Sequence, residues 1–206
     1  DHKDKMLQFQ GYHEIVLRRC SVNLSELKLQ FENISNVVLE RCVFDGGAKE
    51  KETKSAIKFN HCTDVSITGC VFKDFSSRTI EKNYVKNFSV ENTSFENCIY
   101  KFTNDSYEWR STPCVIYIKN DCENSIHFFE NCTFVNCGGK NTAYGYASNF
   151  ICNCKSKLKN YQFTECWNYY TLSGKLVKDP DNYNRRMFPS DTKVENCQVV
   201  NSANIN

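Results

Sequence analysis

Apolar and polar residues alternate in a short sequence motif that recurs many times along this chain. Two apolar residues stand two positions apart, a polar bend follows, and then come Cys or Thr, one variable residue and an aromatic or branched apolar residue. Aligned on the Cys/Thr position, the copies are 22, 28, 23, 39, 34 and 31 residues apart, at Cys20, Cys42, Cys70, Thr93, Cys132, Cys166 and Cys197. Self-similarity at this length predicts a solenoid.

Each copy contains two short strands. The apolar columns before the bend are two residues apart, which is the side-chain period of a β-strand. The Cys/Thr column has the same spacing to the next column, Val22, Phe44, Phe72, Phe95, Phe134, Asn168 and Val199. One out-of-phase residue separates the two strands, and it is often Asn or Gly, which tolerate a left-handed backbone. The chain therefore bends there, and both strands direct their apolar columns into one core.

A third strand precedes several copies, as in Leu29, Phe31 and Ile34 before Val37. Three strands with bends in 22 or 23 residues make one coil of a parallel β-helix, and its coils would lie about 4.8 Å apart. We therefore predict an all-β fold, one right-handed parallel β-helix domain of about seven coils over residues 1–206. The excess spacing predicts insertion loops at about 45–56, 100–113, 138–148 and 170–191.

The stacked columns, from about Gly11 to Ser202, resemble those of the pectin-lyase-like right-handed parallel β-helix superfamily. The phrase Phe-Glu-Asn-Cys-Thr-Phe-Val-Asn-Cys at 129–137 is also similar to the repeats of polymorphic outer membrane protein-type surface proteins, although the Gly-Gly-Ala-Ile motif of that family is absent. Superfamily members that cut pectic polymers use clustered carboxylates, Ca²⁺ and an outward Arg or Lys. Their polygalacturonase motifs (Asn-Thr-Asp, Asp-Asp, Gly-His-Gly and Arg-Ile-Lys) and their pectate lyase signatures are missing here.

The length and net charge of the chain limit the number of domains and the kinds of partner that we expect. A chain of 206 residues suits one domain, and a net charge of +2 gives no electrostatic reason to expect a nucleic-acid partner. No apolar run approaches the roughly 20 residues of a membrane-spanning helix. The sequence opens with Asp-His-Lys-Asp-Lys rather than Met, so we expect a fragment or processed part of a longer chain, from which a secretory signal could have been removed.

Asparagine is abundant, with 24 residues. Six lie in Asn-x-Ser/Thr triplets that can accept N-linked glycans: Asn23, Asn33, Asn87, Asn92, Asn104 and Asn131. A chain this rich in Asn, Ser and Thr also produces such triplets by chance, and Asn can stack in the bends of a solenoid. The density fits a secreted or surface glycoprotein, and we expect an extracellular or cell-surface location.

The thirteen cysteines allow three interpretations: a disulfide scaffold, metal ligands, or buried thiols that pack as small apolar side chains. In-register parallel neighbours point nearly the same way, which suits disulfides poorly, so the shared column favours thiols. Further columns are Cys62 with Cys122 and Cys154, and Cys98 with Cys137. A bridge outside the columns, such as Cys114 with Cys152, remains open. Cys152-Asn-Cys154 is too short for a zinc knuckle, and we expect no metal.

One loose group of polar residues is the candidate for catalysis: His61, Asp64, Asp74, Arg78 and Glu81. They lie in neighbouring coil segments and could share one edge, where a carboxylate pair for glycoside hydrolysis must be about 5–9.5 Å apart. Polar residues also crowd every turn of a solenoid, so the group has a structural interpretation as well. His127 falls in an inward column, where we expect a core or rim histidine rather than a base.

Aromatic and arginine residues gather in and beside the segment 173–190. They are Tyr144, Tyr146, Trp167, Tyr169, Tyr170, Tyr183, Arg185, Arg186 and Phe188. Such mixtures are typical of binding surfaces, and this one could stack sugars or contact a protein partner. Equally, the segment could cover one side or end of the solenoid and bury its rings.

Fold analogy and the missing catalytic motifs favour a non-enzymatic, adhesin-like recognition module that binds a carbohydrate or a protein. Two alternatives remain open. One is a polysaccharide lyase or glycoside hydrolase with a divergent site, for which the resemblance implies Ca²⁺; otherwise we expect no cofactor. The other is a structural component of a filament or larger assembly, because open solenoid ends can associate end to end.

Overall fold

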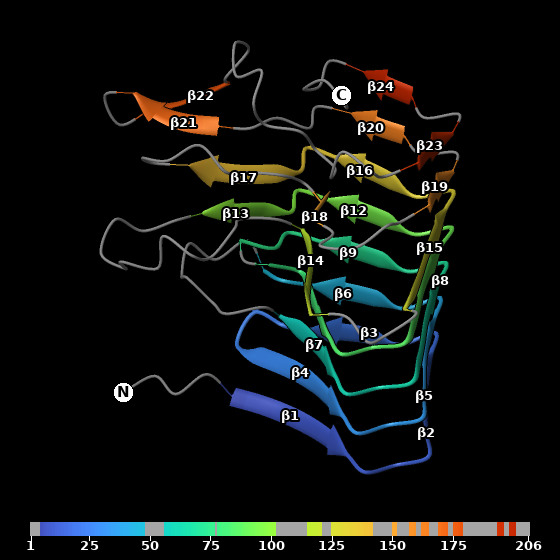
Figure 1. Ribbon diagram of the computed structural model, residues 1–206. Helices are drawn as coiled ribbons and strands as arrows, with labels where there is room; N and C mark the ends of the chain where they lie inside the picture. The colour runs from blue at the N-terminus through green and yellow to red at the C-terminus, as the bar shows by residue number, and fades with distance from the viewer. Residues whose placement is uncertain are drawn as a thin grey trace.

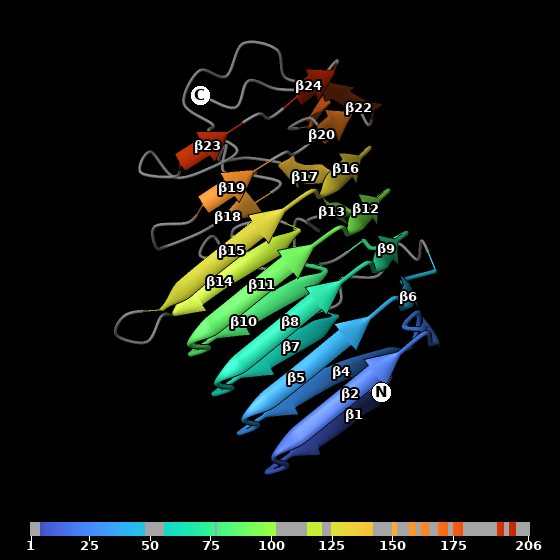
Figure 2. The same ribbon diagram turned by 90° about the vertical axis from the view of Figure 1, so that its right-hand side faces the viewer.

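The structure is a computed structural model that describes residues 5–47, 56–76, 78–101, 115–120 and 125–141, and a set of strands between 150 and 200. All regular structure in these residues is β, and it winds into a right-handed parallel β-helix (Figure 1). Each turn of the chain adds one strand to each side of the helix, and Figure 2 shows the coils stacked in sequence order. The predicted fold class is confirmed.

Three parallel sheets form the sides. Sheet A has six strands: β1 (Lys5–Gln10), β4 (Leu27–Glu32), β7 (Ile57–Asn60), β10 (Ile80–Asn83), β14 (Ile116–Asn120) and β18 (Phe150–Ile151). Sheet B has seven: β2 (Glu14–Arg18), β5 (Asn36–Glu40), β8 (Asp64–Thr68), β11 (Asn87–Glu91), β15 (Ile126–Glu130), β19 (Lys157–Lys159) and β23 (Lys193–Glu195). Sheet C also has seven: β3 (Ser21–Asn23), β6 (Val43–Asp45), β9 (Val71–Lys73), β12 (Ser94–Glu96), β16 (Thr133–Val135), β20 (Gln162–Thr164) and β24 (Gln198–Val200).

A fourth, smaller sheet departs from the prediction. Its strands are β13 (Ile99–Lys101), β17 (Gly138–Asn141), β21 (Tyr169–Leu172) and β22 (Lys175–Lys178), the last two antiparallel. The expectation of loops at 138–148 and 170–191 is therefore wrong where these strands lie. The segment Gly-Gly-Lys-Asn has no apolar alternation, so only its pairing with β13 reveals it as a strand. Most of the predicted loops at 45–56 and 100–113 lies outside the described residues.

The core consists of ladders in which like residues stack on like. Phe44, Phe72, Phe95 and Phe134 are each 0% exposed, and successive ring centroids are 4.9, 5.0 and 4.8 Å apart. The in-register pairing of sheet C sets this spacing, because the distance between parallel strands is close to that of stacked rings. The predicted phenylalanine ladder is confirmed.

A second ladder, in sheet A, begins with aromatic residues and continues with a charged one. Phe9, Phe31 and Phe59 stack at 5.3 and 5.2 Å, but the next residue in register is Lys82, which is fully buried. His127 is also buried, in the first inward column of sheet B next to Phe88 in register, as expected for a core histidine. The interior of these coils is therefore partly polar, which hydrophobic periodicity did not indicate for Lys82.

The bends between strands adopt the left-handed conformation that the out-of-phase residue predicts. In the corner between sheets B and C, Arg19, Arg41, Gly69, Asn92 and Asn131 have φ between 49° and 63°. The other corners also contain a left-handed residue. The residues with positive φ are Asn33, His61 and Tyr84 before sheet B, and Asp74, Asn97 and Asn136 after sheet C. Asparagine ladders cross these corners: Asn131 Nδ2 donates to Asn92 Oδ1 at 3.1 Å, and Asn136 Nδ2 to Asn97 Oδ1 at 2.9 Å.

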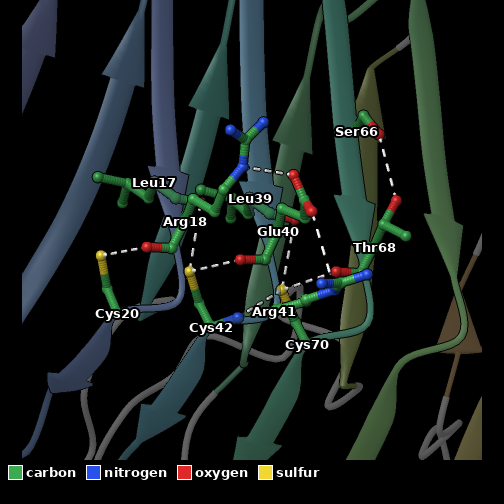
Figure 3. A network of polar contacts seen from close by, with 10 residues as sticks. All are labelled: Leu17, Arg18, Cys20, Leu39, Glu40, Arg41, Cys42, Ser66, Thr68 and Cys70. Carbon is green, nitrogen blue, oxygen red and sulfur yellow. Dashed lines mark hydrogen bonds and ion pairs between the residues drawn. The ribbon is translucent and has the colours of Figure 1, made fainter.

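A cysteine or threonine follows the left-handed residue at most of these corners, and its side chain joins two coils. Cys42 Sγ lies 3.3 Å from Glu40 O in its own coil and 3.3 Å from Leu17 O in the preceding coil (Figure 3). The same double contact recurs at Cys62, Cys70, Cys98, Cys132 and Cys137. The thiol thus adds a second contact to a carbonyl at the strand end that already accepts a backbone hydrogen bond, as Glu40 O does from Arg19 N at 2.8 Å.

All seven cysteines whose side chains the structure describes are free thiols. This agrees with the expectation of a packed thiol column for Cys20, Cys42, Cys70 and Cys132. Burial raises the pKa of the Cys42 and Cys62 thiols and raises that of Cys70 to about 11. The proposed Cys114–Cys152 bridge and the remaining cysteines lie outside the described residues.

Replacing Phe72 by Ala should lower the free energy of unfolding by about 3–5 kcal/mol, because the ring is lost from the middle of a close-packed ladder. Urea unfolding measures this change. Phe72→Leu is the control and should cost less, since it keeps most of the apolar volume. A neutral Phe72→Ala would contradict the ladder.

The corner contacts can be tested at Thr93, which is the only described residue of the Cys/Thr column that is not a cysteine. Its hydroxyl donates to Glu91 O at 2.8 Å and accepts from Cys70 N at 3.3 Å. Thr93→Val keeps the shape and leaves Cys70 N without its acceptor, whereas Glu91 O still accepts from Gly69 N at 2.9 Å. The variant should therefore destabilise by about 1–3 kcal/mol. Thr93→Cys should cost less, because cysteine occupies the neighbouring coils. Equal losses would show that the contacts are incidental.

The raised thiol pKa values predict an alkaline loss of stability. The unfolded chain releases the Cys70 proton near the ordinary value of 9.0, and the folded chain only at about 11. Stability is therefore complete below about pH 9 and should fall between pH 9 and 11, by about 1.4 kcal/mol per pH unit for this thiol. Guanidinium unfolding at several pH values measures the slope. Cys70→Thr should give a shallower slope, and equal slopes would contradict the assignment.

Candidate functional site

The outward side chains of sheet A form two rows that cross from coil to coil. The inward positions of these strands carry the core ladders, so the alternate residues face outward. The first row is Gln8, Gln30, Lys58, Glu81 and Tyr117, and the second is Gln10, Glu32, Asn60 and Asn83. We call these nine residues, with Arg78, the sheet A face.

One carboxylate organises the amide groups of this face. Glu32 Oε2 accepts from Gln8 Nε2 at 2.8 Å and from Gln30 Nε2 at 2.9 Å, and its Oε1 accepts from Asn60 Nδ2 at 3.1 Å. Asn83 Nδ2 then donates to Asn60 Oδ1 at 2.7 Å. Each donor has a definite direction, so the network holds four amide groups in fixed orientations over four successive coils.

A charged cluster adjoins the amide network. Glu81 is 9% exposed, and its two oxygens lie 3.6 Å from Lys58 Nζ and 3.6 Å from Arg78 Nη1. The Arg78 guanidinium carbon lies 4.2 Å from the ring centroid of Tyr117, a cation–π contact. Lys58, Glu81 and Tyr117 belong to three consecutive strands, so the cluster fixes cationic and aromatic groups at neighbouring coils.

Aromatic side chains mark the corner beside this face. His61 and Tyr84, both with positive φ, stack with ring centroids 4.9 Å apart and an interplanar angle of 15°. Tyr84 is 40% exposed. They directly follow Asn60 and Asn83 in the chain, so exposed rings stand next to the end of the amide row.

The structure separates the polar group that the sequence suggested for catalysis. Arg78 and Glu81 come together as an ion pair, whereas His61 stacks at the corner between sheets A and B. Asp64 Oδ1 accepts from Asn87 Nδ2 at 2.5 Å, and Asp74, which follows sheet C, accepts from Asn97 Nδ2 at 3.0 Å. Both aspartates thus accept hydrogen bonds from asparagines of the next coil.

The other two outer faces carry separate ion pairs. On sheet C, Lys73 Nζ lies 2.9 Å from Asp45 Oδ2, and this hydrogen bond holds the pKa of Asp45 below its usual range. On sheet B, Arg18 Nε lies 2.6 Å from Glu40 Oε2 (Figure 3). Exposed pairs of this kind contribute little to stability, and they provide comparison positions for the sheet A face.

The aromatic surface predicted from the sequence lies outside the described residues. Tyr169 and Tyr170 lie in β21, but their side chains are outside the described residues. So are Tyr144, Tyr146, Trp167, Tyr183, Arg185, Arg186 and Phe188.

The candidate glycosylation sites divide into two groups. Asn87 donates to Asp64, and Asn92 and Asn131 pair with each other, so these three serve as ladder residues. Asn92 and Asn131 are also exposed, as are Asn23 and Asn33, which do not take part in these ladders, and Asn104 lies outside the described residues. Three of the six triplets thus have a structural role for their asparagine.

The sequence singled out Arg78 and Glu81 but missed their partners. Lys58, Tyr117 and Glu32 carry no signal of their own in the sequence, because each is one of the outward residues that alternate with apolar residues in its strand. Aligning the third strands of the coils, as Leu29 with Ile57 and Ile80, would have placed Lys58 beside Glu81.

The described residues contain no group of three His, Cys, Asp or Glu side chains arranged to hold a metal ion. Within the same residues, no helix is long and apolar enough to cross a membrane. Comparison of the chain with protein-family models, curated proteins and solved structures finds no match. The fold and the sheet A face therefore define its class, a right-handed parallel β-helix protein with an ordered polar outer face.

Proposed function

We propose that this protein is a non-enzymatic recognition module of the pectin-lyase-like β-helix type, secreted or on the cell surface, that binds a carbohydrate through the sheet A face. The observation that carries the proposal is the network around Glu32, which orients four amides beside the Arg78–Tyr117 pair.

Sugars present hydroxyl groups that both donate and accept hydrogen bonds. Amide side chains offer both capacities in one plane, and aromatic rings such as Tyr84 and Tyr117 can stack against the apolar faces of sugar rings. Because neighbouring coils already hold these groups in place, binding costs little side-chain entropy. A protein partner is the alternative ligand and would need a larger contact area than this face alone.

The carboxylates favour binding over catalysis. Glycoside hydrolysis needs one carboxylic acid and one free carboxylate on either side of the bond. Glu81 is instead held between two cations, and Asp64 and Asp74 each accept from an asparagine of the next coil. These contacts support a role for the three carboxylates in joining coils.

The thiol columns are compatible with an oxidising location. Thiolates are the reactive form of cysteine, and burial raises the pKa of Cys42, Cys62 and Cys70. Buried thiols that ionise poorly persist outside the cell without forming bridges. Asn23 and Asn33, which are exposed and lie outside the asparagine ladders, are then the described positions proposed to carry glycans.

Matched lysine variants test the site. Lys58 and Lys73 both belong to the same coil and both pair with a carboxylate of a neighbouring coil, but on different faces. Lys58→Ala should weaken polysaccharide binding about tenfold, the loss of one charged hydrogen bond, whereas Lys73→Ala should leave it unchanged. Affinity electrophoresis and calorimetry with pectic, xylan and β-glucan polymers measure this difference.

Two results would contradict the proposal. Equal losses from the two lysine variants would place binding away from the sheet A face. Release of reducing or unsaturated ends from these polymers, with or without Ca²⁺, would identify an enzyme instead.

A further inference from the structure

We infer that acidification opens the β-helix between two of its coils, because a buried histidine gains a proton beside a buried lysine. The histidine is His127 in β15, and the lysine is Lys82 in β10. The opening follows from the core alone, whereas its effect on a ligand rests on the function proposed for the sheet A face.

Lys82 and His127 occupy positions that hold phenylalanine in the adjoining coil. Lys82 is in register with Phe59 and is 0% exposed. His127 is in register with Phe88 and is 4% exposed. Two basic side chains therefore stand in place of aromatic rings inside the stack.

The phenylalanines show how close these two positions are. Phe59 and Phe88 belong to successive coils, and their ring centroids are 6.1 Å apart. One coil further along, the same step leads from Lys82 to His127, because each is in register with one of the two rings. The corner between sheets A and B thus places an ammonium group and an imidazole next to each other in the core.

The other described side chains that enclose His127 are apolar. The inward residues of the neighbouring strands are buried: Phe88 in β11, Ile116 and Ile118 in β14, and Phe134 in β16. In the following coil, β19 pairs with β15 so that Lys157 aligns with Phe128 and Lys159 with Glu130, both outward residues of β15. At the described inward positions, the lysine of β10 is therefore the charged side chain beside the imidazole.

The carboxylate closest to this lysine in the chain faces the other way. Glu81 lies on the outer side of β10, between Lys58 and Arg78. The thiol of Cys132, at the far end of β15, contacts the carbonyl groups of the corner between sheets B and C. A proton on His127 thus adds a second positive charge to an apolar interior, where burial and a like charge both disfavour the charged form.

The strand ladder is irregular at the same place. β10 and β14 pair evenly from Ile80 to Lys82, which is opposite Ile118, and then the register shifts so that Asn83 pairs with Asn120. A shift of this kind disrupts the backbone hydrogen bonds of the ladder. Because local opening begins where such bonds are fewest, we expect β10 and β14 to separate first.

The same two strands carry part of the sheet A face. Glu81 and Asn83 are outward residues of β10, and Tyr117 is an outward residue of β14. Separation of the strands removes Tyr117 from the Arg78 guanidinium, whose carbon lies 4.2 Å from the ring centroid. The amide contacts of Glu32 belong to earlier coils and are kept. Acid should therefore weaken the charged and aromatic half of the face.

The unfolded chain sets the pH range of the effect. A histidine in an unfolded chain titrates near about pH 6.5, whereas the folded core disfavours protonated His127. Below that pH the unfolded state binds one more proton, so the contribution of this group to stability is complete above about pH 7 and falls as the pH decreases. The equilibrium constant for unfolding should rise by up to about tenfold for each pH unit below about pH 6.

Three variants test the pair by guanidinium unfolding between about pH 7 and 5. His127→Phe continues the column of Phe88 and should flatten the pH dependence by up to about tenfold per pH unit. Lys82→Met removes the like charge and should give an intermediate slope. The matched control is His61→Asn, at an exposed corner position whose column already holds Asn33 with the same left-handed backbone. It should keep the parental slope, and a parental slope in His127→Phe would overturn the inference.

Hydrogen exchange of the parent chain locates the opening without any variant. After correction for the intrinsic exchange rate, the amides of residues 80–83 and 116–120 should lose protection about tenfold between about pH 7 and 5.5. The amides of β5 and β8 should keep theirs. Unchanged protection in β10 and β14, or an equal loss in all four strands, would overturn the inference.

Polysaccharide binding at the same pH values separates the inference from the proposed function. The parent chain should bind a pectic, xylan or β-glucan polymer about tenfold more weakly at about pH 5.5 than at about pH 7, and His127→Phe should bind equally at both. An equal loss in the two proteins would overturn the role of His127. Lack of binding at every pH would contradict the proposed function, and hydrogen exchange would then decide the inference by itself.

Discussion

The fold depends on the corner at which a left-handed residue is followed by an inward thiol or hydroxyl. The positive φ at positions such as Arg41 turns the chain without breaking the alternation of the two strands. The next side chain, Cys42, then contacts carbonyls of its own coil and of the preceding one. Each corner thereby both ends a strand and sets the register to its neighbour, so successive coils superpose residue by residue.

Superposition has opposite consequences inside and outside the helix. Inside, it stacks Phe72 between two other phenylalanine rings and makes the core a set of continuous columns. Outside, it brings polar residues of different coils into rows, so that Glu32 binds amides from three strands. The same register that stabilises the core also orients the face proposed to bind a carbohydrate.

Much of this architecture could be predicted because residues at the same position of successive repeats stack on one another. The local sequence pattern therefore also indicates the long-range contacts. Aligning the copies of the repeat predicts the column through Phe44 and Phe134, the bends and the buried thiols. The fourth sheet could not be predicted, since β17 consists of glycines and polar residues and forms only by pairing with β13. Buried Lys82 was equally hidden, because its position in a phenylalanine column emerges only from the register with Phe59.

The candidate site, too, could be predicted from the sequence only in part. The sequence by itself determined that the chain is a β-solenoid, which residues point inward and where it bends, because strand period and corner chemistry are local properties. Only the tertiary structure decided that Lys58, Glu81 and Tyr117 are neighbours and that Asp64 and Asp74 belong to asparagine ladders. These contacts join coils separated by segments of unequal length, and the partner of an outward side chain is fixed by inter-coil register, which no single strand encodes.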